Sequence, residues 1–147
     1  MNKRRVVVTG MGMLTPVGLN VKETWQNILA GVSGVSAVDD FDTSDYSTKI
    51  WAKVKNFNIE NHVPLKDARR MDMFTQYGIA AADEAISDAG LTIDETLSRR
   101  VGVAVGAGIG GIQTITNNQD KLVLGGPRKV SPFFIPAGII NMVAGQS

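Results

Sequence analysis

The first residues that suggest chemistry are the glycines of segment 106–111, which have the spacing Gly-x-Gly-x-x-Gly. Between a strand and a helix, this spacing lets backbone N–H groups approach a pyrophosphate at the helix N-terminus. The acidic residue expected about 20 residues later to bind a ribose is missing, so Arg128 would have to receive a 2′-phosphate instead. Glycines after a buried strand also serve where two backbones pass closely. The sequence favours this packing interpretation and keeps nucleotide binding as the weaker alternative.

A cluster of cations begins at Lys66. Lys66, Arg69 and Arg70 are spaced so that on a helix they would share one face. Asp67 and Asp72 offset their charge only in part. Such a run is most simply a solvated helix end. The sharper hypothesis is a docking surface for an acidic partner.

A second basic group lies near the C-terminus. No acidic residue follows Asp120, whereas Lys121, Arg128 and Lys129 do, so residues 121–147 carry a charge of +3 from three cations and no anion. The whole chain has a net charge of only +1, which gives no general field to attract nucleic acid or an anionic membrane. In the sharper hypothesis Arg128 and Lys129 are a second contribution to the docking surface, and the simpler interpretation is again ordinary solvated charge.

Groups for nucleophilic or metal chemistry are scarce in this sequence. There is no cysteine and a single histidine, His62, so a metal site would need carboxylates for most of its ligands. No Gly-x-Ser-x-Gly turn supplies a serine nucleophile. His62 is interpreted as a loop residue, because no orienting carboxylate or nucleophile is recognisable beside it. The sequence predicts no catalytic residue, no metal and no cofactor in these 147 residues.

Strands that end in glycine alternate with helices along the chain, which favours an α/β fold with a mainly parallel sheet. Asn20 is the expected N-cap of the first helix, and Gly31 its stop. The apolar stripe of the longest helix is rich in alanine, which lets a neighbouring segment approach closely. The expected strands span 5–9 and 101–105, with a short strand or edge in 51–57; the expected helices span 21–30, 66–89 and 111–122, and a buried helix starts within 136–144.

The two ends of the chain carry apolar runs. The run at 6–8 is shorter than the roughly 7–15 residues of a signal peptide, so we expect a cytoplasmic protein. Residues 130–147 are uncharged but contain Pro132 and Pro136, and a membrane span needs about 20 predominantly apolar residues. This segment is therefore predicted to be core. Because domains normally end in polar linkers, we expect the domain to be incomplete at Ser147.

Several segments together resemble the β-ketoacyl-[acyl carrier protein] synthases, and most closely the elongating synthases of type II bacterial fatty-acid synthesis. The most specific is Gly-Gly-Pro-Arg-Lys-Val-Ser-Pro-Phe-Phe-x-Pro at 125–136. The resemblance covers all 147 residues. The other segments that carry it are 4–18, 41–43, 70–77, 106–111 and 141–145.

The resemblance implies the thiolase-like fold, two similar α/β halves in five αβαβα layers, of which residues 1–147 would be most of the first half. Family members are acyltransferases of lipid metabolism. They hold an acyl chain as a thioester on a cysteine and condense it with malonyl-ACP, whose decarboxylation supplies the carbanion while two histidines polarise the enolate. The cysteine follows a Val-Ala-Gly sequence like that at 143–145, so this segment alone is expected to be inactive.

The resemblance also implies roles for particular residues. Ile109 resembles the gate at the floor of the acyl tunnel, and Phe134 and Ile139 resemble residues that a homodimer partner contributes to the pocket. A non-catalytic subunit like a chain-length factor is the first alternative, and a nucleotide-binding oxidoreductase domain the second. The residues expected to bind acyl carrier protein are Lys66, Arg69, Arg70, Arg128 and Lys129.

Overall fold

A computed structural model of the chain describes residues 3–146. The strands are short and antiparallel, and Ser36 pairs with Trp51. The helices are α1 (Val21–Leu29), α2 (Leu65–Ala68), α3 (Met73–Asp88), α4 (Glu95–Ser98), α5 (Ile112–Gly125), α6 (Phe134–Gly138) and α7 (Met142–Gln146); the 3-10 turns are η1 (Ile59–Asn61) and η2 (Pro127–Lys129); and the strands are β1 (Ser36–Ala37) and β2 (Ile50–Trp51).

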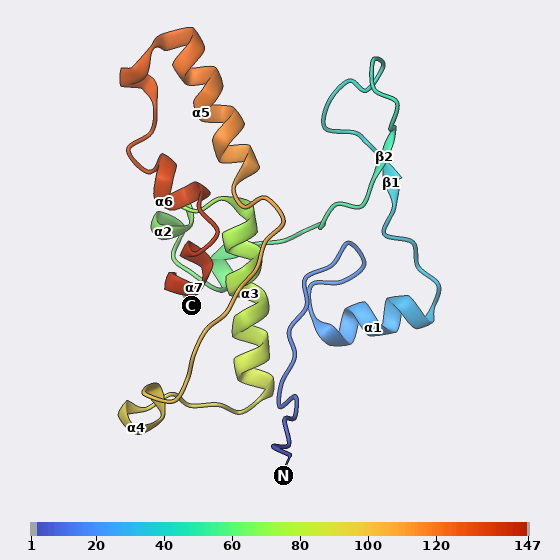
Figure 1. Cartoon of the computed structure of the whole chain (residues 1–147). Helices are drawn as coiled ribbons and strands as arrows, with labels where there is room; N and C mark the ends of the chain where they lie inside the picture. The colour runs from blue at the N-terminus through green and yellow to red at the C-terminus, as the bar shows by residue number, and fades with distance from the viewer. Residues whose placement is uncertain (1–2, 147) are drawn as a thin grey trace.

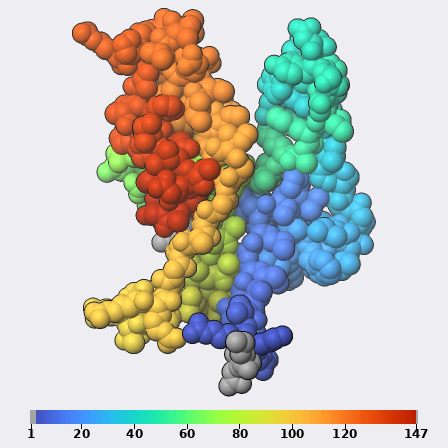
Figure 2. Space-filling model, viewed as in Figure 1, coloured from blue at the N-terminus to red at the C-terminus, as the bar shows by residue number. Residues whose placement is uncertain are grey.

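Helix α3 stands at the centre of the molecule (Figure 1), with the N-terminal segment and α1 on one side and α5, α6 and α7 on the other. In the space-filling view the lobe of α5 to α7 and the lobe that contains the β1–β2 hairpin rise on opposite sides (Figure 2). The most buried apolar residues belong to α2, α3, α6 and α7, so the core lies where these helices meet. They are Ala68, Ile79, Ala80, Ala137 and Val143.

The N-terminal segment packs closely on the alanine face of α3. A Cβ added to Gly12 would overlap the carbonyl oxygen of Ala81. The backbone N–H of Met13 donates to Glu84 Oε2 at 2.8 Å, and that of Val21 donates to Glu84 Oε1 at 2.8 Å. The close approach that the alanine stripe predicted is thus confirmed. The acidic side chains of α3 satisfy backbone donors of the segment that the glycine brings near.

The predicted paired strands at 5–9 and 101–105 are wrong for the part of the chain that the structure describes. Neither is hydrogen-bonded in a ladder there, and Val6 and Val8 are 92% and 80% exposed. An apolar β-branched run forms a strand only where a neighbouring segment accepts and donates its backbone hydrogen bonds. Between residues 3 and 146 no such segment lies beside either run, so the predicted parallel sheet is not formed.

The single helix predicted over 66–89 is two helices. Gln76 Nε2 donates to the carbonyl oxygens of Ala68 and Met71 at 3.2 and 3.1 Å, and Asp72 caps α3. A side chain that supplies hydrogen bonds to the backbone competes with helix continuation. Arg70 thus lies beyond the end of α2, in the turn between the two helices, where its N–H donates to the Asp67 carbonyl at 2.9 Å. The helix start expected in 136–144 is likewise divided between α6 and α7.

Other predicted elements are confirmed. Asn20 caps α1 by accepting from the N–H of Glu23 at 2.7 Å, and Gly31 ends it at φ 70°. The predicted helix over 111–122 is α5, which continues to Gly125. No helix within residues 3–146 is long and apolar enough to cross a membrane.

Candidate functional site

The first basic group lies at the end of α2. Lys66 is on the helix, Arg69 is its C-cap, and Arg70 follows; all three side chains are exposed. Arg70 turns toward the segment before α6, and its Cζ lies 4.7 Å from the centre of the Phe133 ring. A guanidinium over an aromatic face gains about 0.5–1 kcal/mol at an exposed site. The contact joins residues 63 positions apart in the sequence (133 minus 70).

The second basic group lies on η2, just after α5. Gly126 adopts φ 77°, which lets the chain turn sharply, and Pro127 starts the 3-10 turn that carries Arg128 and Lys129. The Lys129 side chain folds back toward the end of α5. A Cβ added to Gly125 would lie only 2.6 Å from Lys129 Cγ. Glycine at position 125 therefore leaves room for the aliphatic part of the Lys129 side chain at the end of α5.

Asp72 links the start of α3, just after the first basic group, to the start of α5, the helix that leads to the second. Its Oδ2 accepts from the Thr114 N–H at 2.8 Å in the first turn of α5, and its Oδ1 accepts from the Phe74 N–H at 3.5 Å in the first turn of α3. Its residue is only 8% exposed. Asp72 forms no ion pair with Arg69 or Arg70 in the part of the chain that the structure describes, and a partial offset of their charge stays a prediction. Its carboxylate is used by the starts of two helices, where the N-terminal dipoles favour a negative charge.

The buried side-chain amide of Asn118 holds the segment between η2 and α6, residues 130–133, against α5. Asn118 is 6% exposed. Its Nδ2 donates to the Thr114 carbonyl at 2.8 Å, and its Oδ1 accepts from the Ser131 N–H at 2.8 Å. Since Ser131 lies between η2 and α6, this contact attaches the segment that follows the second basic group to α5. Sequence reasoning missed Asn118 and the contact of Asp72 with Thr114, because these partners lie 13 and 42 residues away.

Two clefts border this surface. The inner cleft has a volume of about 170 Å³ and lies between α5, α6 and the end of α2; its lining includes Arg69, Arg70, Lys121 and Phe134. The outer cleft has a volume of about 330 Å³ and is lined by Asp120, Lys121, Leu124, Gly125 and Lys129. Of the five predicted docking residues, Arg69 and Arg70 thus line the inner cleft and Lys129 lines the outer cleft, whereas Lys66 and Arg128 line neither of the two.

The geometry around 106–111 argues against a nucleotide site. The N–H of Gly111 donates to the Gly138 carbonyl at 2.9 Å, and that of Thr114 donates to the Asp72 carboxylate. A phosphate would have to displace a carboxylate from the helix N-terminus. A Cβ on Gly111 would lie 2.6 Å from Gly138 Cα, so this glycine serves the close passage of two backbones, as the favoured interpretation predicted.

The three predicted acyl-pocket residues are only partly brought together. Ile109 precedes the glycines that pack on Gly138 and Ile140, and Ile139 lies in that same partner segment. Ile109 is 65% exposed and Ile139 is 39% exposed. Phe134 instead lines the inner cleft with the arginines. Their role in an acyl pocket stays a prediction.

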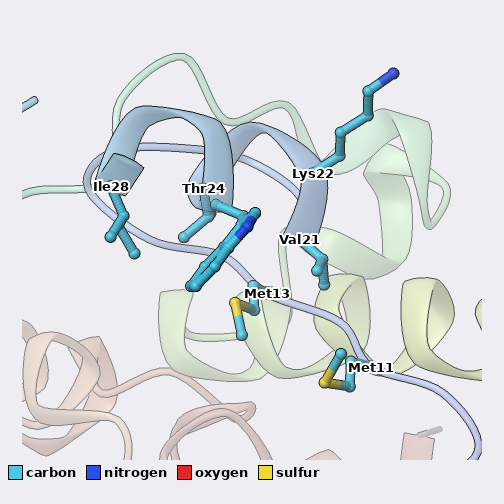
Figure 3. Close-up of a pocket in the computed structure, with 7 residues that line it drawn as sticks. Met11, Met13, Val21, Lys22, Thr24 and Ile28 are labelled. Carbon is cyan, nitrogen blue, oxygen red and sulfur yellow. The ribbon is translucent and has the colours of Figure 1, made fainter. Parts of the chain in front are cut away.

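An apolar groove of about 540 Å³ lies on the other side of α3. It is formed by α1 and the N-terminal segment, which contributes Met13 (Figure 3). Helix α1 turns apolar side chains to this groove, and two of them, Trp25 and Ile28, are 60% and 53% exposed. The groove is lined by Met11, Met13, Val21, Lys22, Thr24, Trp25 and Ile28.

His62 has the orienting carboxylate that sequence reasoning did not find. Its Nδ1 lies 3.0 Å from Asp83 Oδ2, and its ring stacks on Phe57 at a centroid distance of 6.2 Å. Tyr77 meets Phe57 edge-on at 5.1 Å, and burial there raises the pKa of the Tyr77 phenol. These contacts attach the segment after the hairpin to α3. Within the described residues no three potential metal ligands come together.

Comparison with solved structures identifies the class of fold. The chain matches a β-ketoacyl synthase from Burkholderia phymatum STM815 with a TM-score of 0.78 and 27% identity, over 97% of this chain and 36% of that one. It matches the ishigamide ketosynthase/chain length factor with a TM-score of 0.75 and 30% identity, over 95% of this chain and 35% of that one. The fold is thus the thiolase-like α/β fold of ketosynthases, present here in part.

Sequence comparison gives the family. The description "Beta-ketoacyl synthase, N-terminal domain" matches residues 3–146, and the chain therefore belongs to the β-ketoacyl synthase family. It is 52% identical over 146 residues to the 3-oxoacyl-[acyl-carrier-protein] synthase 2 of Vibrio cholerae, which is 99% of this chain and 35% of that protein. The chain thus spans about a third of the length of the curated relative.

Proposed function

We propose that this chain is the N-terminal part of a 3-oxoacyl-ACP synthase that elongates fatty acids. The observation that carries the proposal is the arrangement of the two basic groups around adjacent clefts, with Arg70 held over Phe133. An acidic carrier protein would meet complementary charge on this surface, which raises association rate and specificity. The 52% identity to a 3-oxoacyl-[acyl-carrier-protein] synthase 2 of Vibrio cholerae supports the choice of acyl carrier protein as partner.

In this proposal residues 1–147 bind the carrier protein and shape the acyl pocket, and the rest of the protein supplies the catalytic residues. The nucleophile would be a cysteine, and this chain has none. The rest of the protein would then cover the exposed apolar segments 5–9 and 101–105 and the apolar groove beside α1. This explains why these surfaces are exposed in residues 3–146. We further propose a cytoplasmic homodimer, in which Phe134 and Ile139 reach the partner's acyl pocket and Ile109 gates the chain's own.

The proposal is tested on the full-length gene product. Incubated with acyl-ACP and malonyl-ACP, it should form the 3-oxoacyl-ACP lengthened by two carbons, with loss of carbon dioxide, as detected by mass spectrometry. Changing Arg128→Glu together with Lys129→Glu should lower turnover of the carrier-bound substrates. Turnover of small acyl thioesters should be little affected. An equal loss on both substrate types would exclude a docking role for η2.

A second candidate is a non-catalytic subunit that resembles a chain-length factor and pairs with an active synthase. The 30% identity to the ishigamide ketosynthase/chain length factor favours keeping this candidate. Both candidates use the same docking surface, but only the synthase carries the cysteine. An acyl-enzyme found by mass spectrometry on the full-length product would support the synthase. The 147-residue segment alone should form no acyl-enzyme and take up no cerulenin covalently.

A further inference from the structure

We propose that Lys121 is a docking residue for the acidic carrier protein, and that it joins the two basic groups into one continuous surface. This inference rests on the proposed function and deepens it. Lys121 lies on α5, between the arginines that follow α2 and the cations on η2. It lies outside the five residues whose docking role the family resemblance implies.

Its position follows from the helical repeat of α5. Thr114, Asn118 and Lys121 are spaced by four and three residues, so they lie on one face of the helix. The first two residues of this face are fixed by Asp72 and Ser131 through hydrogen bonds of 2.8 Å. That face of α5 is therefore directed toward α6 and the segment between η2 and α6. Lys121 lies on the same face.

Lys121 borders both clefts. Of the residues that line either cleft, it is the one that the inner and the outer cleft share. On the inner side it faces the same space as Arg69 and Arg70, and on the outer side the same space as Lys129. The positive surface would be interrupted without it, since Asn117 and Asn118 are neutral and Asp120 is acidic.

The charge of Lys121 thus offsets that of Asp120 at the midpoint of the surface. An acidic partner that spans both basic groups would pass this midpoint. A glutamate at position 121 would place two adjacent carboxylates there and repel the partner. Because Lys121 is exposed, its replacement should leave the fold intact, which separates a docking effect from a folding effect.

The test compares three variants of the full-length gene product in steady-state condensation assays. Lys121→Glu should raise the KM for carrier-bound substrate about 2- to 5-fold at unchanged kcat, the size expected for exposed charge pairs. Lys121→Arg should stay close to the original protein. Lys55→Glu makes the same charge change at an exposed lysine beside the hairpin and should have no effect. The KM for a small acyl thioester should be unchanged in all three.

The outcomes separate this inference from the proposed function. If Arg128→Glu with Lys129→Glu raises KM while Lys121→Glu does not, the carrier protein docks without Lys121 and this inference is wrong. If neither change alters KM, the surface is not a carrier-protein site and both proposals fail. An effect of Lys121→Glu that persists in about 1 M salt would also contradict a charge-based role, because exposed charges are then screened within about 3 Å.

Discussion

Replacement of Asp72 by alanine probes how the two basic groups are held in place. The carboxylate accepts from the Thr114 N–H at 2.8 Å and from the Phe74 N–H at 3.5 Å, in a residue only 8% exposed. A buried hydrogen bond to a charged acceptor contributes about 1.5–3 kcal/mol. The longer capping contact contributes about 0.5–1 kcal/mol, at the low end for a helix N-cap. Asp72→Ala should therefore lower the free energy of unfolding by about 2–4 kcal/mol.

Urea denaturation of the full-length product gives the total cost, and amide hydrogen exchange shows where it falls. Exchange at Thr114 and along the first turn of α5 should accelerate more than exchange at the far end of α3. The matched control is Asp94→Ala, which removes the exposed cap of α4, where Asp94 accepts from Leu97 at 2.7 Å, and should cost about 1 kcal/mol. A cost for Asp72→Ala no larger than that of the control would refute the argument that Asp72 joins two helices.

Three further predictions follow from single contacts. Gly12→Ala should destabilise by about 3 kcal/mol in urea denaturation, since the new Cβ meets a backbone oxygen of α3 that cannot move aside, and an unchanged unfolding midpoint would contradict this close approach. Burial raises the pKa of Tyr77 above 10.0, so the folded chain holds this proton more tightly than the unfolded one. The stability that this proton contributes is present below pH 10 and is lost as pH rises through the raised pKa of Tyr77. Tyr77→Phe should therefore flatten the dependence of the free energy of unfolding on pH above pH 10. An unchanged dependence would contradict the raised pKa of the Tyr77 phenol. Phe133→Leu should leave Arg70 without its aromatic face and weaken carrier-protein binding about 2- to 5-fold, and unchanged binding in a calorimetric titration would show that the stacking does not position the guanidinium.

The sequence predicted features whose cause is local. The start and end of α1 depend on Asn20 and Gly31, and the close approach to α3 depends on its alanines; each is visible in the sequence itself. The sequence also identified the five docking candidates, through a family pattern that covers the whole chain.

Features set by distant partners were not predictable in this way. Val6 to Val8 have the composition of a buried strand, but a strand forms only with a partner, and none lies beside them within residues 3–146. The break between α2 and α3 depends on Gln76, whose amide reaches back to two carbonyls. The double use of Asp72 depends on Thr114, which no local pattern connects to it. These long-range contacts decide how the site is assembled.

The central claim is that an acidic carrier protein docks on the surface formed by the end of α2, α5 and η2. The most direct measurement is amide hydrogen exchange of the full-length product with and without acyl carrier protein. The account predicts protection of segments 65–71 and 126–131, with the β1–β2 hairpin unchanged. Protection of the hairpin or of the groove beside α1, with exchange at 65–71 and 126–131 unaltered, would contradict it.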